Sequence, residues 1–202
     1  MALETLQPDE VANSLQKTRF TLNQAITLLN NISILMKHQL SVSYELEPIN
    51  LAMTIEKVIS LVQDTYPSRK IEVTAPVPFN SFVLADLLFE HIFINLLTNA
   101  VKNDPHDIVR VKITIEQVQD HPEDNVNYII SVTDFGTGIH PDQRVNLFTR
   151  FTEFRKKGRG SGLGFFIIKT LAERYNGRIW IENRISDDYT QGTCFKIQLQ
   201  AA

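Results

Sequence analysis

Apolar and polar residues alternate in five short stretches, and this period of two is the feature that most constrains the fold. Alternation is typical of β-strands that bury one face. The stretches are Arg69–Val73, Ile108–Val118, Tyr128–Asp134, Arg178–Asn183 and Cys194–Leu199. A spacing of three or four residues predicts helices before and between them, at Leu51–Val62, Phe82–Lys102 and Gly162–Tyr175. We therefore expect an α+β fold, a two-layer sandwich in which a mixed, mostly antiparallel sheet carries helices on one face.

The N-terminal part has a helical period throughout. Its apolar positions recur every three or four residues from Asp9, a suitable N-cap, to about Leu40. The opposite face is polar without being strongly basic, so we expect the apolar stripe to pack on another helix rather than on lipid. Pro48 then interrupts the pattern. We predict two units: residues 1–47, a long helix with its exit linker, and residues 48–202, the α+β domain.

Composition excludes several classes of protein. A formal net charge of -3 gives no general attraction to nucleic acid or to an anionic membrane. Cys194 is the only cysteine, so no internal disulfide can form, which suits a reduced compartment. No apolar run reaches the ~20 residues that a membrane-spanning helix needs. We expect a cytoplasmic domain that binds no nucleic acid, and any membrane part of a receptor would lie outside this sequence.

Three polar side chains share one face of the helix predicted at Phe82–Lys102. Asn95, Asn99 and Lys102 follow one another at intervals of four and three residues, so they project from the same side. An amide oxygen is a suitable ligand for Mg²⁺, and an ammonium suits a phosphate. The same spacing also suits an ordinary solvated helix face, and the helix alone does not decide between the two.

Two glycine-containing segments favour a nucleotide site. Asp134 ends a predicted strand, and the glycines that follow it let the backbone turn closely beneath a ligand. The Asp134 carboxylate could accept a hydrogen bond from an amine of that ligand. Further on, every second residue from Gly158 to Gly164 is glycine, directly before an apolar helix. Such a loop exposes N–H groups where a phosphate chain could sit. An ordinary turn and a flexible linker are the alternatives for the two segments.

In this order, the segments resemble the ATP-binding fold shared by gyrase, the large heat-shock chaperones, mismatch-repair ATPases and histidine kinases, the Bergerat fold. The N, G1, F and G2 boxes of histidine kinases and a final glycine–threonine pair are matched by Asn95–Lys102, Asp134–Ile139, Leu147–Phe151, Gly160–Gly164 and Gly192–Thr193. The resemblance extends from about Leu51 to Leu199. Within the superfamily, Lys102 and the paired phenylalanines point to histidine kinases.

The resemblance implies a role for each matched residue. Asp134 would hold the adenine amino group, Asn99 and Asn95 would hold Mg²⁺ on the phosphates, and Lys102 would touch a phosphate. Those two asparagines and the lysine would therefore be the catalytic residues. The other expected ATP contacts are Gly136, Gly138, Ile139, Arg159, Gly160, Ser161, Gly162, Leu163, Gly164 and Thr193. One departure is Asn103, which stands where an aromatic residue is common in the family.

By the same resemblance, the chain is the ATP-binding catalytic domain of a two-component sensor histidine kinase, and the γ-phosphoryl group passes to a histidine absent from this sequence. His38 is not followed by an acidic residue, so residues 1–47 resemble the second helix of the dimerisation hairpin. The expected partners are the phosphoacceptor hairpin of the parent kinase, a response regulator, and a second copy bound through the N-terminal helix. Two alternatives stay open: a nucleotide-binding assembly module without phosphoryl transfer, and a serine kinase of the anti-sigma type.

Overall fold

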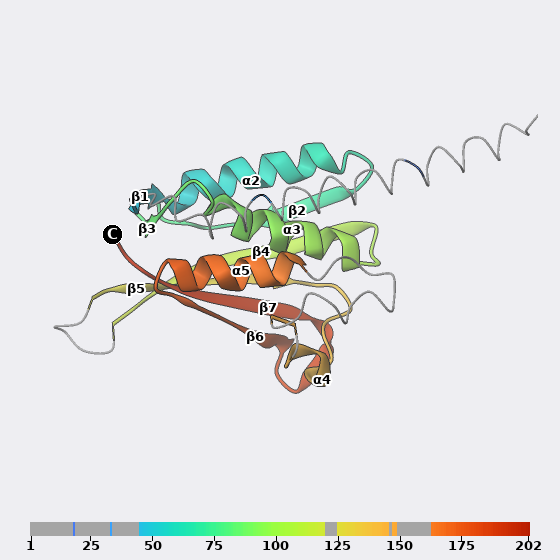
Figure 1. Ribbon diagram of the computed structural model, residues 1–202. Coiled ribbons are helices and arrows are strands. Elements are labelled where there is room, and N and C mark those ends of the chain that lie inside the picture. The colour runs from blue at the N-terminus through green and yellow to red at the C-terminus, as the bar shows by residue number, and fades with distance from the viewer. Residues whose placement is uncertain (1–17, 19–32, 34–44, 120–124, 146, 149–162) are drawn as a thin grey trace, which may run out of the picture.

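The computed structural model describes residues 45–119, 125–145, 147–148 and 163–202, together with Thr18 and Ser33 (Figure 1). The long helix predicted between Asp9 and Leu40 lies outside the described residues, as does the segment 149–162 with most of the predicted G2 box. The described strands and the helices between them make up the α+β domain.

A five-stranded mixed sheet forms one layer of this domain. The strand order is β2-β4-β5-β7-β6, with bounds Lys70–Thr74 for β2, Ile108–Val118 for β4, Asn127–Asp134 for β5, Arg178–Ile185 for β6 and Asp188–Gln200 for β7. Strands β2 and β4 run parallel, and the other three pairs are antiparallel. The prediction of a mixed, mostly antiparallel sheet is confirmed.

Three helices pack side by side on one face of that sheet, as Figure 1 shows, and form the second layer. They are α2 (Leu51–Thr65), α3 (Glu90–Asn103) and α5 (Leu163–Arg174), and the short helix α4 (Pro141–Arg144) lies apart from them. Their apolar faces are buried against strand residues in one continuous core. The predicted two-layer α+β class is therefore confirmed. None of the described helices is long and apolar enough to cross a membrane.

One element of the prediction is wrong. Residues Phe82–Ala85, expected as the first turn of a helix, form strand β3, which pairs antiparallel with β1 (Glu47–Asn50). Val83 and Ala85 are buried while Phe82 and Leu84 are half-buried, so the local period is two rather than 3.6. The pairing partner β1 was not predicted as a strand, because it contains Pro48 and its sequence indicates a hinge. A strand at the edge of a sheet nevertheless tolerates proline.

A buried ion-pair network fixes the end of helix α5 to the segment that connects β3 and α3. Asp86 is 5% exposed, and its Oδ2 accepts from the Arg174 guanidinium Nε at 2.8 Å. Its Oδ1 accepts from the Tyr175 hydroxyl at 2.6 Å and from the backbone N–H of Leu88 at 2.9 Å. Burial, together with the neighbouring carboxylate, raises the pKa of the Tyr175 hydroxyl far above its usual range. Both carboxylate oxygens are therefore satisfied, and the C-terminal end of α5 is anchored.

Candidate functional site

Helix α3 carries the predicted asparagines on the face that it turns toward α5. Asn95 and Asn99 are both half-buried. The Asn95 amide Nδ2 donates to the backbone carbonyl of His91 at 2.8 Å, which leaves its Oδ1 available. The Asn99 Nδ2 is buried and has no hydrogen-bond partner among the described residues. Because an unpaired buried amide costs about 1–3 kcal/mol, a ligand that engages this group would be bound favourably.

Gly164 allows the first turn of α5 to approach Asn95 closely. A Cβ atom at this glycine would lie only 2.7 Å from the Asn95 Oδ1. The first N–H groups of a helix have no partner within the helix and carry positive potential. The structure thus places an amide oxygen beside a helix N-terminus that begins at the buried Leu163. This is a suitable environment for a phosphate and a cation that the phosphate binds.

Lys102 lies near the C-terminal end of the same helix. Its side chain is exposed, but protein atoms around the ammonium partly desolvate it and lower its pKa. Among the described residues, no group of three or more histidine, cysteine or acidic side chains could hold a metal ion. A magnesium ion at this face would therefore depend on amide oxygens and on the oxygens of a bound phosphate, a mixture that Mg²⁺ accepts readily.

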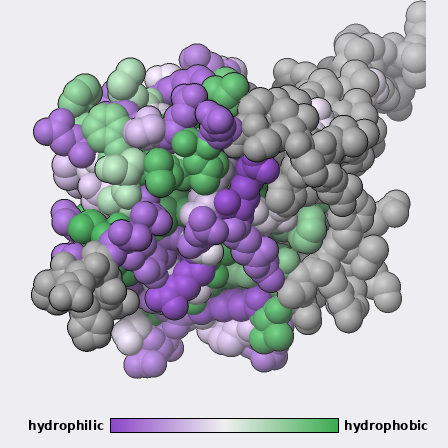
Figure 2. Space-filling view, turned by 60° about the vertical axis from the view of Figure 1, so that its left-hand side comes forward, coloured by the Kyte–Doolittle hydropathy of each residue, from purple (hydrophilic) through white to green (hydrophobic). Residues whose placement is uncertain are grey.

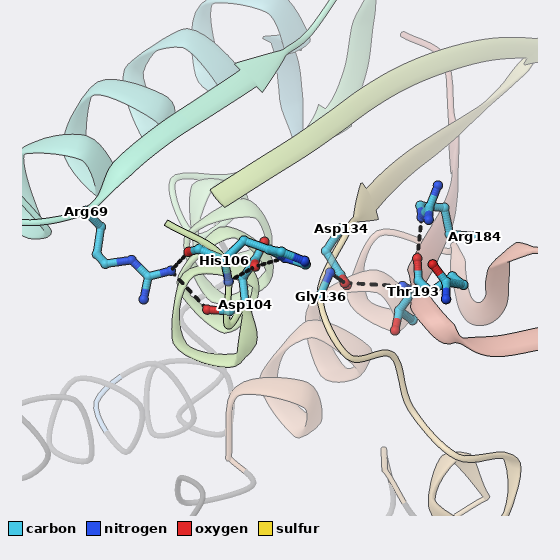
Figure 3. A network of polar contacts seen from close by, with 8 residues as sticks. Arg69, Asp104, His106, Asp134, Gly136, Arg184 and Thr193 are labelled. Carbon is cyan, nitrogen blue, oxygen red and sulfur yellow. Dashed lines mark hydrogen bonds and ion pairs between the residues drawn. The ribbon is translucent and has the colours of Figure 1, made fainter. Parts of the chain in front are cut away.

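The second half of the site is Asp134, the last residue of β5. Its Oδ1 accepts from two backbone N–H groups, that of Gly136 at 3.0 Å and that of Thr193 at 3.2 Å, as Figure 3 shows. Its Oδ2 makes no hydrogen bond to the described residues. Burial raises the pKa of this carboxyl, and the two backbone donors only partly oppose the effect. Asp134 is thus a half-buried acceptor with one oxygen free for an N–H donor.

The glycines around Asp134 are required by the path of the chain itself. Gly138 has φ +65°, and a Cβ there would lie 1.6 Å from the carbonyl oxygen of Tyr189. Gly192 has φ +107°, and a Cβ there would lie 2.2 Å from the carbonyl oxygen of Asp134. The loop after β5 therefore packs tightly against the start of β7, which explains how Thr193 reaches Asp134.

Helix α3 connects the two halves of the site. Its final residue, Asn103, donates from Nδ2 to the carbonyl oxygen of Asn99 at 2.8 Å. The carbonyl oxygen of Asn103 lies 3.2 Å from the position that a Cβ at Gly136 would take. The middle of α3 thus contacts α5 through Asn95, and its end contacts the loop that holds Asp134. The structure brings together, around one helix, residues that are far apart in the sequence.

Some predicted residues play supporting roles or are not described. The buried Leu147 and the neighbouring Phe148 pack on the domain, and the Phe148 ring meets Phe165 edge to face at 6.1 Å. Phe165 in turn stacks on Phe195 at 5.3 Å, so the phenylalanine pair and α5 share one aromatic cluster. Ile139 packs against the core and offers its carbonyl oxygen to an arginine. The remaining predicted contacts lie outside the described residues: Phe151, Arg159, Gly160, Ser161 and Gly162.

Two arginines near Asp134 were missed by the sequence reasoning. Arg144 donates from Nε to the carbonyl oxygen of Ile139 at 2.9 Å and contacts the Asn183 amide, so it ties the loop after β5 to β6. Arg184 lies over the Phe135 ring, 4.5 Å from its centroid, and its charge slightly lowers the pKa of Asp134. Neither arginine lies in a recognisable motif, so no sequence signal marked them.

The comparison with protein families decides the assignment. Residues 85–202, which include every described part of the site, match the family described as histidine kinase-, DNA gyrase B-, and HSP90-like ATPase. The chain belongs to this ATPase family. The predicted resemblance to the superfamily is therefore confirmed, and the fold described above is the fold of its ATP-binding domains.

Relatives of this ATPase domain include sensor kinases. The chain is 25% identical over 205 residues to the autoinducer 2 sensor kinase/phosphatase LuxQ of Vibrio parahaemolyticus, covering 97% of this chain and 23% of LuxQ. The mycobacterial sensor histidine kinase MprB is 26% identical, with a TM-score of 0.62 over 77% of this chain and 97% of the solved MprB chain. Full-length ShkA, solved in complex with AMPPNP, shares the fold with 22% identity and a TM-score of 0.67 over 98% of this chain and 40% of ShkA. The chain spans 18% to 30% of the length of the first curated relatives that it matches.

Proposed function

We propose that this chain is the ATP-binding catalytic domain of a two-component sensor histidine kinase, and that it positions ATP for transfer of the γ-phosphoryl group to a histidine. The observation that carries the proposal is the arrangement around α3. A free carboxylate oxygen of Asp134 lies at one end, and the Asn95 amide lies beside the N-terminus of α5 toward the other. The two ends of a nucleotide match these two ends of the site, because an amine-bearing base lies at one end and the phosphates lie at the other.

Asp134 would recognise the base. Its Oδ2 can accept from the exocyclic amine of adenine while its Oδ1 stays fixed by Gly136 and Thr193. This pairing requires an ionised carboxyl, and it favours adenine over a base that presents a carbonyl oxygen at the same position. Gly136 would keep this end of the site compact, because a Cβ there would lie 3.2 Å from the Asn103 carbonyl oxygen and 3.3 Å from the Asp134 Oδ1.

The phosphate end would be held by α3 and α5. Lys102 would contribute a positive charge, and the first turn of α5 would contribute backbone N–H groups. Asn95 and Asn99 would hold Mg²⁺, which when bound neutralises charge on the phosphate oxygens. Phosphoryl transfer needs mainly positioning and charge stabilisation from the protein, so these groups would suffice without a covalent intermediate.

The wider setting is also part of the proposal. Residues 1–47 would belong to a dimerisation hairpin, residues 48–202 would form the catalytic domain, and a second copy and a response regulator would be the protein partners. Because the sequence has a single cysteine, a reduced compartment such as the cytoplasm would suit the domain. The sensor kinase names among its relatives support this setting.

Calorimetric titration with AMPPNP tests the nucleotide site. We expect saturable binding that strengthens with Mg²⁺ and is lost in Asp134→Asn, while Asp142→Asn, which removes an exposed carboxylate from α4, keeps its affinity. Equal affinity in wild type and Asp134→Asn would remove that residue from the site.

Transfer is tested separately, by incubating the chain with labelled ATP and a phosphoacceptor hairpin of the histidine kinase type. Acid-labile label on the hairpin supports a histidine kinase. Acid-stable label would indicate a serine kinase instead, and bound nucleotide without any transfer would indicate an assembly module.

A further inference from the structure

A second carboxylate lies buried next to the base end of the site. Asp104 directly follows α3, and its side chain is only 1% exposed. Its Oδ1 accepts from the backbone N–H of His106 at 2.9 Å and lies 2.6 Å from the Nδ1 of the same histidine. Its Oδ2 is buried and has no hydrogen-bond partner among the described residues. A buried carboxylate oxygen without a partner is costly to the fold, so it requires an explanation.

Local turn formation does not require this charge. Asp104, Pro105 and His106 form a tight turn in which one side-chain oxygen caps a backbone N–H. A serine, threonine or asparagine oxygen could make the same cap without burying a negative charge. Arg69 donates to the backbone carbonyl oxygens of Asp104 and His106, both at 2.9 Å, and no hydrogen bond from this guanidinium to the Asp104 carboxylate is present in the described part of the chain.

The turn adjoins the loop that carries Asp134. The residue before Asp104 is Asn103, whose carbonyl oxygen lies 3.2 Å from the position of a Cβ at Gly136, and Gly136 itself donates to Asp134. Figure 3 shows Asp104 and His106 between Arg69 and Asp134. The negative charge of Asp104 acts on Asp134 and adds to the effect of burial in raising the pKa of that carboxyl.

We propose that Asp104 is a positioning residue of the base site: its buried negative charge acts through Asp134 and adds to the effect of burial on how the affinity for an amine-bearing base depends on pH. This inference rests on the proposed nucleotide site, in which only the ionised form of Asp134 accepts from the base. The chain would thereby bind nucleotide less well in mild acid than a similar site without the second carboxylate.

The other charged groups around Asp134 have defined effects. Arg184, on β6, lies over Phe135 and lowers the pKa of Asp134, which opposes Asp104. His106 contacts Asp104 directly, so its protonated form would offset the negative charge. The guanidinium of Arg69, between α2 and β2, donates to the carbonyl oxygens of the turn. Removing the Asp104 charge should therefore leave Arg184 to act on Asp134 with less opposition.

The test is the affinity for Mg·AMPPNP measured over a series of pH values from neutral to acidic, because the pKa of the Asp134 carboxyl is raised above its usual value. In wild type the affinity should fall as the pH drops through the pKa of Asp134. In Asp104→Asn the midpoint of this fall should move to lower pH by more than the error of the measurement, because the like charge that disfavours the ionised form of Asp134 is gone. Asp104→Thr, which keeps an oxygen for the His106 N–H, should shift the midpoint in the same direction.

Asp107→Asn is the matched control, because it removes the same charge from an exposed position just beyond this turn and should leave the midpoint unchanged. Equal midpoints in wild type and both Asp104 variants would overturn the inference. Titration of the Asp134 carboxyl by ¹³C NMR needs no ligand, and it should show the same shift. If no variant binds nucleotide at any pH, the proposed function fails, and the NMR titration still decides whether Asp104 acts on Asp134.

Discussion

Replacing Gly164 by alanine should separate the stability of this ATPase domain from its use of magnesium. The new methyl carbon would lie 2.7 Å from the Asn95 Oδ1 and 3.4 Å from its Cγ, so the amide must rotate away. Because the contact is with the end of a flexible side chain, the backbone can stay in place. The rotation breaks the 2.8 Å hydrogen bond from Asn95 to the His91 carbonyl, which costs about 1 kcal/mol.

An opposing effect keeps the total change in stability small. Alanine is favoured over glycine within a helix by about 0.5–1 kcal/mol. The free energy of unfolding of Gly164→Ala should therefore stay within about 1 kcal/mol of the wild-type value, as measured by urea denaturation. In the proposed magnesium site, the displaced amide would no longer hold the metal. Changes of this kind near a metal typically lower affinity by about 10–100-fold, so the gain in AMPPNP affinity on adding Mg²⁺ should shrink by about tenfold or more.

A double-mutant cycle provides the control. In an Asn95→Ala background there is no amide for the methyl group to displace, so adding Gly164→Ala should have no further effect on the affinity for Mg·AMPPNP. An unchanged magnesium dependence in the single variant Gly164→Ala would refute the reasoning. So would a loss of more than about 3 kcal/mol in stability, because it would mean that the backbone, and not the side chain, had to move.

Three further predictions concern the anchor of α5 and the base site. Asp86→Ala should lower the free energy of unfolding by about 3–5 kcal/mol in urea, because it removes the buried carboxylate that pairs with the Arg174 guanidinium, whereas Tyr175→Phe should cost only about 1 kcal/mol. Asp134→Asn should raise the melting temperature at neutral pH, since its folded-state pKa is raised: the stabilising contribution of this carboxyl is present below the unfolded pKa and is lost as the pH rises through the folded pKa. The increase should vanish in scans near about pH 3, and a lower melting temperature at neutral pH would contradict the argument. Gly192→Ala should destabilise the domain by about 2 kcal/mol or more in urea and abolish AMPPNP binding, because its Cβ would meet the backbone of Asp134; wild-type behaviour would show that the loop can shift freely.

Much of the fold was predictable because its strands and helices bury one face each. The alternation in Ile108–Val118 and the spacing of Phe93, Leu96, Leu97 and Ala100 directly reflect which residues meet the core. Strand β3 was wrongly predicted as part of a helix because Phe82–Ala85 is too short to show its period. Its partner β1, Glu47–Asn50, lies far earlier in the chain. Strand pairing over such a distance leaves no local signal.

The candidate site was predictable to the extent that it relies on local backbone shape. The loop after Asp134 needs glycine at residue 138, and the helix face presents Asn95 and Asn99 at fixed intervals, so both appear as motifs. Arg184 and Asp104 act through space, from positions whose neighbours in the sequence have other tasks. Their influence on Asp134 depends on burial and proximity, neither of which is encoded in a short segment.

Within the described part of the chain, the carboxylate that would bind the base accepts hydrogen bonds from main-chain donors alone. Asp134 receives its two hydrogen bonds from the N–H groups of Gly136 and Thr193, and every residue type except proline supplies such a group. Evolution can therefore replace the side chain at residue 193 without deleting the donor, provided that the buried volume is kept. Only the route of the chain is constrained. A substitution scan should accordingly find that residue 193 accepts small replacements, whereas its neighbour Gly192, packed against the backbone of Asp134, should accept none.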